Sequence, residues 1–164
     1  MAKKDKSKKE KSPKQMYEQL QKVYSLPTFN VINADFELSS IETEEQFFLR
    51  AVVKRMEERL NFFQDIFSNV LNPDMGSLSV LHESKFFDEK EKERLFNIFQ
   101  KLMLSQRKCM QAGVCLLDDC CAKTIKDVFQ DYALLKEETQ RLAKILRGTW
   151  EKQVGAKEEL GYFG

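Results

Sequence analysis

The sequence is poor in the residues that make tight turns and in the residue that most often carries acid–base catalysis. It contains 6 Gly, 3 Pro and a single His among 164 residues. So few glycines and prolines argue against the many turns of a β-sandwich or barrel and favour long helices. One histidine excludes every metal site built from several histidines and most His-based catalysis. These absences favour a soluble helical domain.

Recognisable catalytic motifs are also missing. The sequence has no Gly-rich phosphate loop and no dinucleotide fingerprint, and it has no Glu-x-x-His pair of the di-iron type. The single histidine, His82, lies in an apolar connection, where a Ser/Cys–His–Asp arrangement is not credible. No stretch approaches the roughly 18 apolar residues of a membrane-spanning helix. We therefore expect a non-enzymatic protein that has no cofactor and no membrane span.

Cysteines occur four times, but never as a C-x-x-C pair. The segment CLLDDCC, residues 115–121, is the one compact cluster of groups that could hold a thiophilic ion, through Cys115, Asp118, Cys120 and Cys121. Adjacent cysteines at the start of a helix point in different directions, and zinc sites favour C-x2–4-C spacing. No apolar h-region of the kind found in secretion signals follows the lysines of residues 1–14, so we expect free thiols in a reducing cytoplasm rather than disulfides or a metal site.

Charge is divided between a basic end and an acidic body. The formal net charge is +1, yet residues 1–14 alone carry +5, and the remaining 150 carry −4. We predict that residues 1–14 are disordered, because they offer almost no apolar surface to bury. This arm is either a solubilising segment or a polyanion-binding tether for RNA, which would be sensitive to salt. The lysines that could contact phosphates are Lys3, Lys4, Lys6, Lys8, Lys9, Lys11 and Lys14.

Residues 15–42 predict a short amphipathic helix followed by an extended strap. Apolar residues recur at helical spacing as far as Pro27, which ends the pattern. From there Ile32, Ala34, Phe36 and Leu38 alternate with polar residues, a period typical of a strand. One strand has no partner here, so we expect a strap laid across the helices. Its expected anchors are Phe29, Val31, Phe36 and Leu38.

Three long helices are predicted over residues 43–154. The first begins at Thr43, which with Gln46 matches a capping box, and ends at Asn72-Pro73. Residues 73–87 are too apolar for a free loop and predict a short helical turn. Asp88 caps the second helix, whose apolar stripe is broken by Gln106. Its expected apolar positions are Leu95, Ile98, Phe99, Leu102, Met103, Met110 and Val114.

The third helix begins at Asp118-Asp119 and carries a pattern close to that of a coiled coil. Cys121, Val128, Leu135 and Leu142 lie seven residues apart. Because the links between the long helices are short or partly packed, neighbours should run antiparallel. The predicted fold is therefore all-α: an antiparallel three-helix bundle with a short N-terminal helix, a strap and a disordered basic tail.

Aromatic residues suggest where a protein partner binds. The side chains of Phe47, Phe48 and Phe62 join the core phenylalanines to cover more than one face of the first long helix. A helix with so wide an apolar face must contact the strap or a partner. We expect residues 155–164 to form a flexible tail, in which Tyr162 and Phe163 either fold back on the core or dock on a partner. We therefore expect a module that binds a protein partner or a second copy of itself, with RNA or ribosome association through the lysine arm as the alternative.

Overall fold

The computed structural model describes residues 11–151, and these form helices joined by turns with no strand among them. The all-α class is therefore confirmed. The predicted tail lysines up to Lys9 and the C-terminal tail, residues 155–164, lie outside the described residues. The predicted disordered arm, residues 1–14, extends too far, because helix α1 (Pro13–Tyr24) already includes Lys14. Ser12 caps α1 through the backbone N–H of Gln15, so a specific cap begins the helix.

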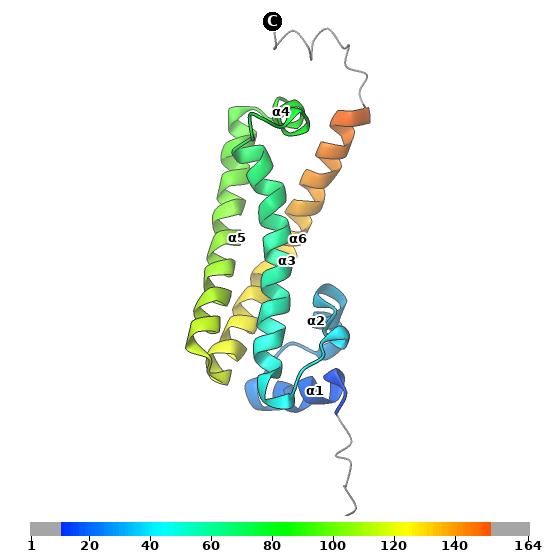
Figure 1. The fold of residues 1–164 in the computed structure, drawn as a ribbon, viewed down its shortest axis with the longest axis vertical. Coiled ribbons are helices and arrows are strands. Elements are labelled where there is room, and N and C mark those ends of the chain that lie inside the picture. The colour runs from blue at the N-terminus through cyan, green and yellow to red at the C-terminus, as the bar shows by residue number, and fades with distance from the viewer. Residues whose placement is uncertain (1–10, 152–164) are drawn as a thin grey trace, which may run out of the picture.

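Three long helices, α3 (Phe48–Leu71), α5 (Glu89–Cys115) and α6 (Asp118–Glu151), pack against one another along most of their length. Consecutive long helices run in opposite directions (Figure 1). The four heptad residues of α6, Cys121 to Leu142, are all buried as predicted. Thr139 also lies in this seam, where its hydroxyl donates to the Leu135 carbonyl at 2.7 Å. A hydroxyl that bonds within its own helix can be buried at little cost.

The first long helix begins later than predicted. A short 3₁₀ turn, η2 (Glu45–Phe47), precedes α3, and Thr43 does not cap it. The expectation of a capping box at Thr43 was wrong because this turn moves the cap position of the helix to Phe47. In the first connection, the predicted helical turn is present as α4 (Leu78–Ser84). The cap on the second helix is also present, since Asp88 Oδ1 accepts from the Glu91 N–H at 2.7 Å.

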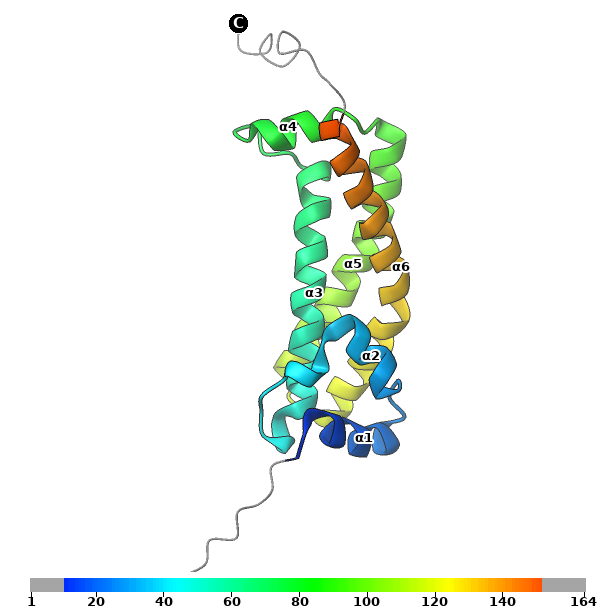
Figure 2. The same ribbon diagram turned by 90° about the vertical axis from the view of Figure 1, so that its right-hand side faces the viewer.

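The predicted extended strap is wrong. Residues 29–36 form helix α2 (Phe29–Phe36), followed by the 3₁₀ turn η1 (Leu38–Ser40). Phe29, Ile32 and Phe36 are spaced i, i+3 and i+7, so one helical face buries all three, while Val31 points outward and is 53% exposed. Glu37, in the left-handed region at φ 53°, ends the helix. In Figure 2, α2 lies across the lower halves of α3 and α6.

The corner between α5 and α6 carries a disulfide bond that the sequence reasoning did not expect. Cys115 and Cys120 are joined, with their Cα atoms 6.6 Å apart, while Cys109 and Cys121 are free and buried. The prediction of four free thiols was wrong because the tight corner brings two cysteines, five residues apart, within bonding range. Leu116 turns the chain at φ 59°, and the Arg50 guanidinium donates to its carbonyl at 2.6 Å.

The buried face of α5 differs from the predicted apolar stripe. Leu95 and Leu102 are buried as expected, but Met110 and Val114 are 50% and 80% exposed. The positions that face the core instead include Ser105, Gln106, Cys109 and Ala112. Gln106 is satisfied there because its Nε2 donates to Asn61 Oδ1 and Gln64 Oε1 of α3, both at 2.7 Å. The apolar stripe of α5 is thus rotated toward the outside.

Candidate functional site

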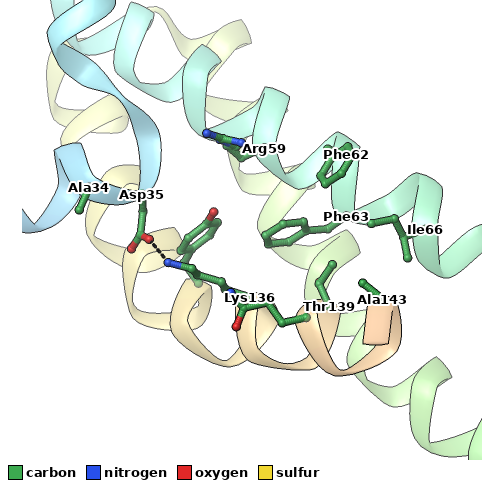
Figure 3. A pocket seen from close by; sticks show the side chains of 11 residues that line it. Ala34, Asp35, Arg59, Phe62, Phe63, Ile66, Lys136, Thr139 and Ala143 are labelled. Atoms are coloured by element: carbon green, nitrogen blue, oxygen red, sulfur yellow. Dashed lines mark hydrogen bonds and ion pairs between the residues drawn. The ribbon is translucent and has the colours of Figure 1, made fainter. Parts of the chain in front are cut away.

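A groove runs between α2, α3 and α6, and we call it the α2–α6 groove. It has a volume of about 290 Å³. Its apolar wall comes from α3, through Phe62, Phe63 and Ile66, and faces Thr139 and Ala143 of α6 (Figure 3). The Asp35 carboxylate of α2 closes one end, where it accepts from the Lys136 ammonium of α6. The groove is therefore lined mainly by apolar side chains, with polar Thr139 and Gln140 on the α6 side, and is charged at one end.

Aromatic packing fixes the floor of the groove. The Phe63 ring stacks on Tyr132 with their centroids 5.5 Å apart, and Tyr132 packs on Phe36 at 4.4 Å. This chain of three rings ties α3, α6 and α2 together, so the groove stands on a packed base. Beside the floor, the Phe62 ring lies 6.3 Å from that of Phe63 but is 58% exposed. The floor is thus closely packed, whereas the Phe62 ring is open to a ligand.

Charges at the rim of the groove are largely neutralised by their own neighbours. Lys136 pairs with Asp35, and Arg59 donates to the Glu37 carboxylate at 2.9 Å. Burial and the nearby Asp35 carboxylate raise the pKa of Tyr132 to about 12, against a smaller opposing effect of Arg59. Tyr132 therefore stays neutral in the physiological range. The groove pairs an apolar wall with compensated ions, a composition that suits an apolar ligand with a polar edge.

The predicted partner-binding phenylalanines have different fates. Phe62 lines the groove, whereas Phe47 lies apart from it under the Arg50 guanidinium, 5.4 Å from the ring centroid, and is 42% exposed. Phe48 is completely buried and so cannot belong to an exposed surface, which corrects that part of the prediction. Phe48 is buried because it is the first residue of α3 and lies on the side of that helix that faces the core. Tyr162 and Phe163 lie outside the described residues.

Two of the seven candidate phosphate-binding lysines are in the described part of the chain, and both contact carboxylates. Lys11 Nζ lies 2.7 Å from Glu45 Oε1, and Lys14 Nζ lies 3.8 Å from Glu18 Oε1. The Lys11 contact joins the segment before α1 to the turn that precedes α3. These two cations are therefore engaged by the body of the protein itself. Lys3, Lys4, Lys6, Lys8 and Lys9 lie outside the described residues.

The candidate metal ligands do not converge. The disulfide occupies Cys115 and Cys120, and Cys121 points into the core. Within residues 11–151, no group of three His, Cys, Asp or Glu side chains is placed to hold a metal ion. His82 lies at the other end of the bundle, where it packs on Trp150 with ring centroids 4.4 Å apart. It thus joins α4 to the end of α6.

Sequence reasoning found Phe62 but missed the rest of the groove. Asp35 and Lys136 are 101 residues apart, and neither belongs to a motif. The helical spacing of Phe29, Ile32 and Phe36 was the one available signal, since it would have placed a helix over α3 and α6.

No helix within residues 11–151 is both long and apolar enough to cross a membrane. No protein-family model, curated protein or solved structure matches the chain.

Proposed function

We propose that the protein is a non-enzymatic interaction module that binds an apolar segment of a protein partner in the α2–α6 groove. The observation that carries the proposal is the Phe62 ring, which is 58% exposed beside a floor of packed aromatic rings. Exposed aromatic residues next to a preformed pocket are typical of binding hot spots. An interaction of this kind needs no cofactor and no catalytic group.

The size and charge of the groove define the class of ligand. A volume of about 290 Å³ is at the lower limit for sites of cofactors or drug-sized ligands. It suits a few side chains presented by a helix or an extended peptide, the usual mode in which an amphipathic segment enters an apolar groove. Because Lys136 and Arg59 already have carboxylate partners, the ligand has no need to bring an opposite charge.

A peptide selection tests this proposal with purified components. Random peptides are selected for binding to the immobilised protein, and the affinity of the selected peptides is measured by fluorescence anisotropy. We expect apolar peptides whose affinity falls at least tenfold in the Phe62→Asp variant, since that change puts a charge at the mouth of the groove. The matched control is Val31→Asp, which alters a similarly exposed apolar residue of α2 that does not line the groove.

Two results would contradict the proposal. One is a selection that yields no peptide binder at all. The other is a set of binders whose affinity is unchanged by Phe62→Asp, or that respond equally to Val31→Asp. Circular dichroism of each variant checks that the helical content is intact, which we expect because both side chains are more than half exposed.

A further inference from the structure

The outward face of α5 carries a row of apolar side chains that the bundle does not cover. Phe96 is 49% exposed, Leu104 63% and Met110 50%, and Met103 is half-buried beside them. Phe96, Met103 and Met110 are seven residues apart, so they share one side of the helix. We call this surface the α5 face. A seven-residue spacing of apolar side chains is typical of a helix that packs against another helix.

The α5 face lies on the other side of the bundle from the α2–α6 groove. In Figure 1, α5 forms one edge of the molecule and α2 lies toward the opposite edge, with α3 and α6 between them. Figure 2, turned by 90°, places α2 in front and α5 behind, in agreement with that arrangement. The two surfaces are therefore separate, and a ligand in the groove leaves the α5 face accessible.

Charges on the α5 face are arranged in opposite signs around its middle. Glu93 and Arg107 each lie seven residues from Gln100, one before it and one after it. Both are exposed, and neither forms an ion pair with another residue of the range 11–151. At 1.5 Å per residue, each lies about 10 Å along the helix from Gln100. The face is therefore acidic on one side of its centre and basic on the other.

We infer that the α5 face binds the α5 face of a second copy of this chain, with the two helices antiparallel and their two-fold axis near Gln100. In this arrangement Arg107 of each copy lies opposite Glu93 of the other, and Phe96 lies opposite Leu104. A parallel pairing would place Arg107 against Arg107 and Glu93 against Glu93, which is unfavourable. The surface is thus complementary to itself in one orientation, as a two-fold interface requires.

A second copy fits the α5 face better than a polyanion does. Of the cations on α5 after Glu93, Arg94 is held by Glu138 at 2.6 Å and Lys108 lies 3.6 Å from Asp131. Lys101 and Arg107 are left for a ligand, and Glu93 lies on the same face. Of the four apolar side chains that define the face, only Phe96 is aromatic, whereas proteins that bind single-stranded nucleic acid stack successive bases on aromatic rings. Methionine side chains adapt readily to an opposing helix surface.

Charge reversal tests the pairing and its orientation. Sedimentation velocity over a concentration series should show a monomer–dimer equilibrium for the full chain. Glu93→Arg and Arg107→Glu should each weaken the dimer at least tenfold, because each places like charges against one another. An equimolar mixture of the two variants should recover the dimer, since positions 93 and 107 are then both cationic in one copy and both acidic in the other. Lys144→Glu, an exposed change on α6, is the matched control.

A crosslink locates the two-fold axis independently. With Gln100→Cys, mild oxidation should join two copies through that position, because residue 100 faces its own counterpart. The free native thiols, Cys109 and Cys121, are buried and serve as the background in the parent protein. Phe62→Asp should leave the dimer unchanged, so failure of the proposed function and failure of the pairing are distinguishable.

Three outcomes would overturn the inference. The first is a chain that stays monomeric at hundreds of micromolar. The second is a dimer whose affinity ignores both charge reversals, or whose mixed variants do not associate. The third is a monomer that uses Arg107 to bind RNA or phosphatidylglycerol vesicles, which would assign the α5 face to a polyanion.

Discussion

Two adjacent phenylalanines, Phe62 and Phe63, should respond very differently to truncation. Phe63 is 7% exposed and stacks on Tyr132, so Phe63→Ala removes a buried ring and leaves a cavity. Changes of this kind cost about 3–5 kcal/mol. Phe62 is 58% exposed, and its truncation should cost about 1 kcal/mol or less, because neighbouring side chains can close the small gap that the ring leaves. The difference between the two losses measures how much more Phe63 contributes to the stability of the fold than Phe62 does.

Urea unfolding measures both values. A domain with a stability of about 5–15 kcal/mol and a urea slope of about 2 kcal/mol per molar should lose roughly 1.5–2.5 M of its midpoint in Phe63→Ala. Phe62→Ala should shift the midpoint by about 0.5 M or less. Circular dichroism follows the helices, and fluorescence of the single tryptophan, Trp150, follows the α4–α6 end. Equal losses in the two variants would refute the assignment of Phe62 to an open surface.

Three further predictions concern stability. Reduction of the Cys115–Cys120 bond should lower the free energy of unfolding by about 2 kcal/mol, the value for a short closed loop, as measured by urea titration with and without a phosphine reductant. Gly113→Ala should stabilise α5 by up to about 1 kcal/mol, seen as a higher urea midpoint, since a Cβ there meets open space. The pKa of Tyr132 is raised to about 12 in the folded protein. Its neutral phenol therefore contributes to the free energy of unfolding below pH 10, and this contribution is lost as the pH rises toward 12. Urea midpoints should therefore fall more steeply above pH 10 in the parent than in Tyr132→Phe.

The long helices could be predicted because their patterns extend over several turns. Cys121, Val128, Leu135 and Leu142 repeat over three heptads, and all four are buried. The prediction of a strap over residues 28–42 was wrong for the opposite reason, because the pattern there is short. Over so short a segment, Ile32 and Phe36 fit a strand of period two and a helix with i, i+4 spacing equally well. Packing on α3 and α6 decides between them, and a single sequence carries no record of that packing.

The candidate sites depended on contacts that sequence order conceals. The groove needs Asp35 and Lys136 to meet across 101 residues, and the disulfide needs a corner as tight as the one at Leu116. The sequence pattern identified the apolar residues of α5, but it did not show which of them face the core. Polar Gln106 faces inward because Asn61 and Gln64 satisfy its amide, and this rotation exposes Met110. The partners of a buried polar group therefore decide which apolar residues remain for a surface.

The two proposed surfaces have a joint consequence. Because α5 and α2 lie on opposite sides of the bundle, a dimer formed through α5 would carry its two α2–α6 grooves on its outer sides. Neither groove would be blocked by the other copy, and both would be related by the same two-fold axis. A partner with two apolar segments would then bind more tightly than one segment alone, provided its linker spans the dimer. The Arg107→Glu variant should abolish this gain while leaving the affinity for a single segment unchanged, since Arg107 does not line the groove.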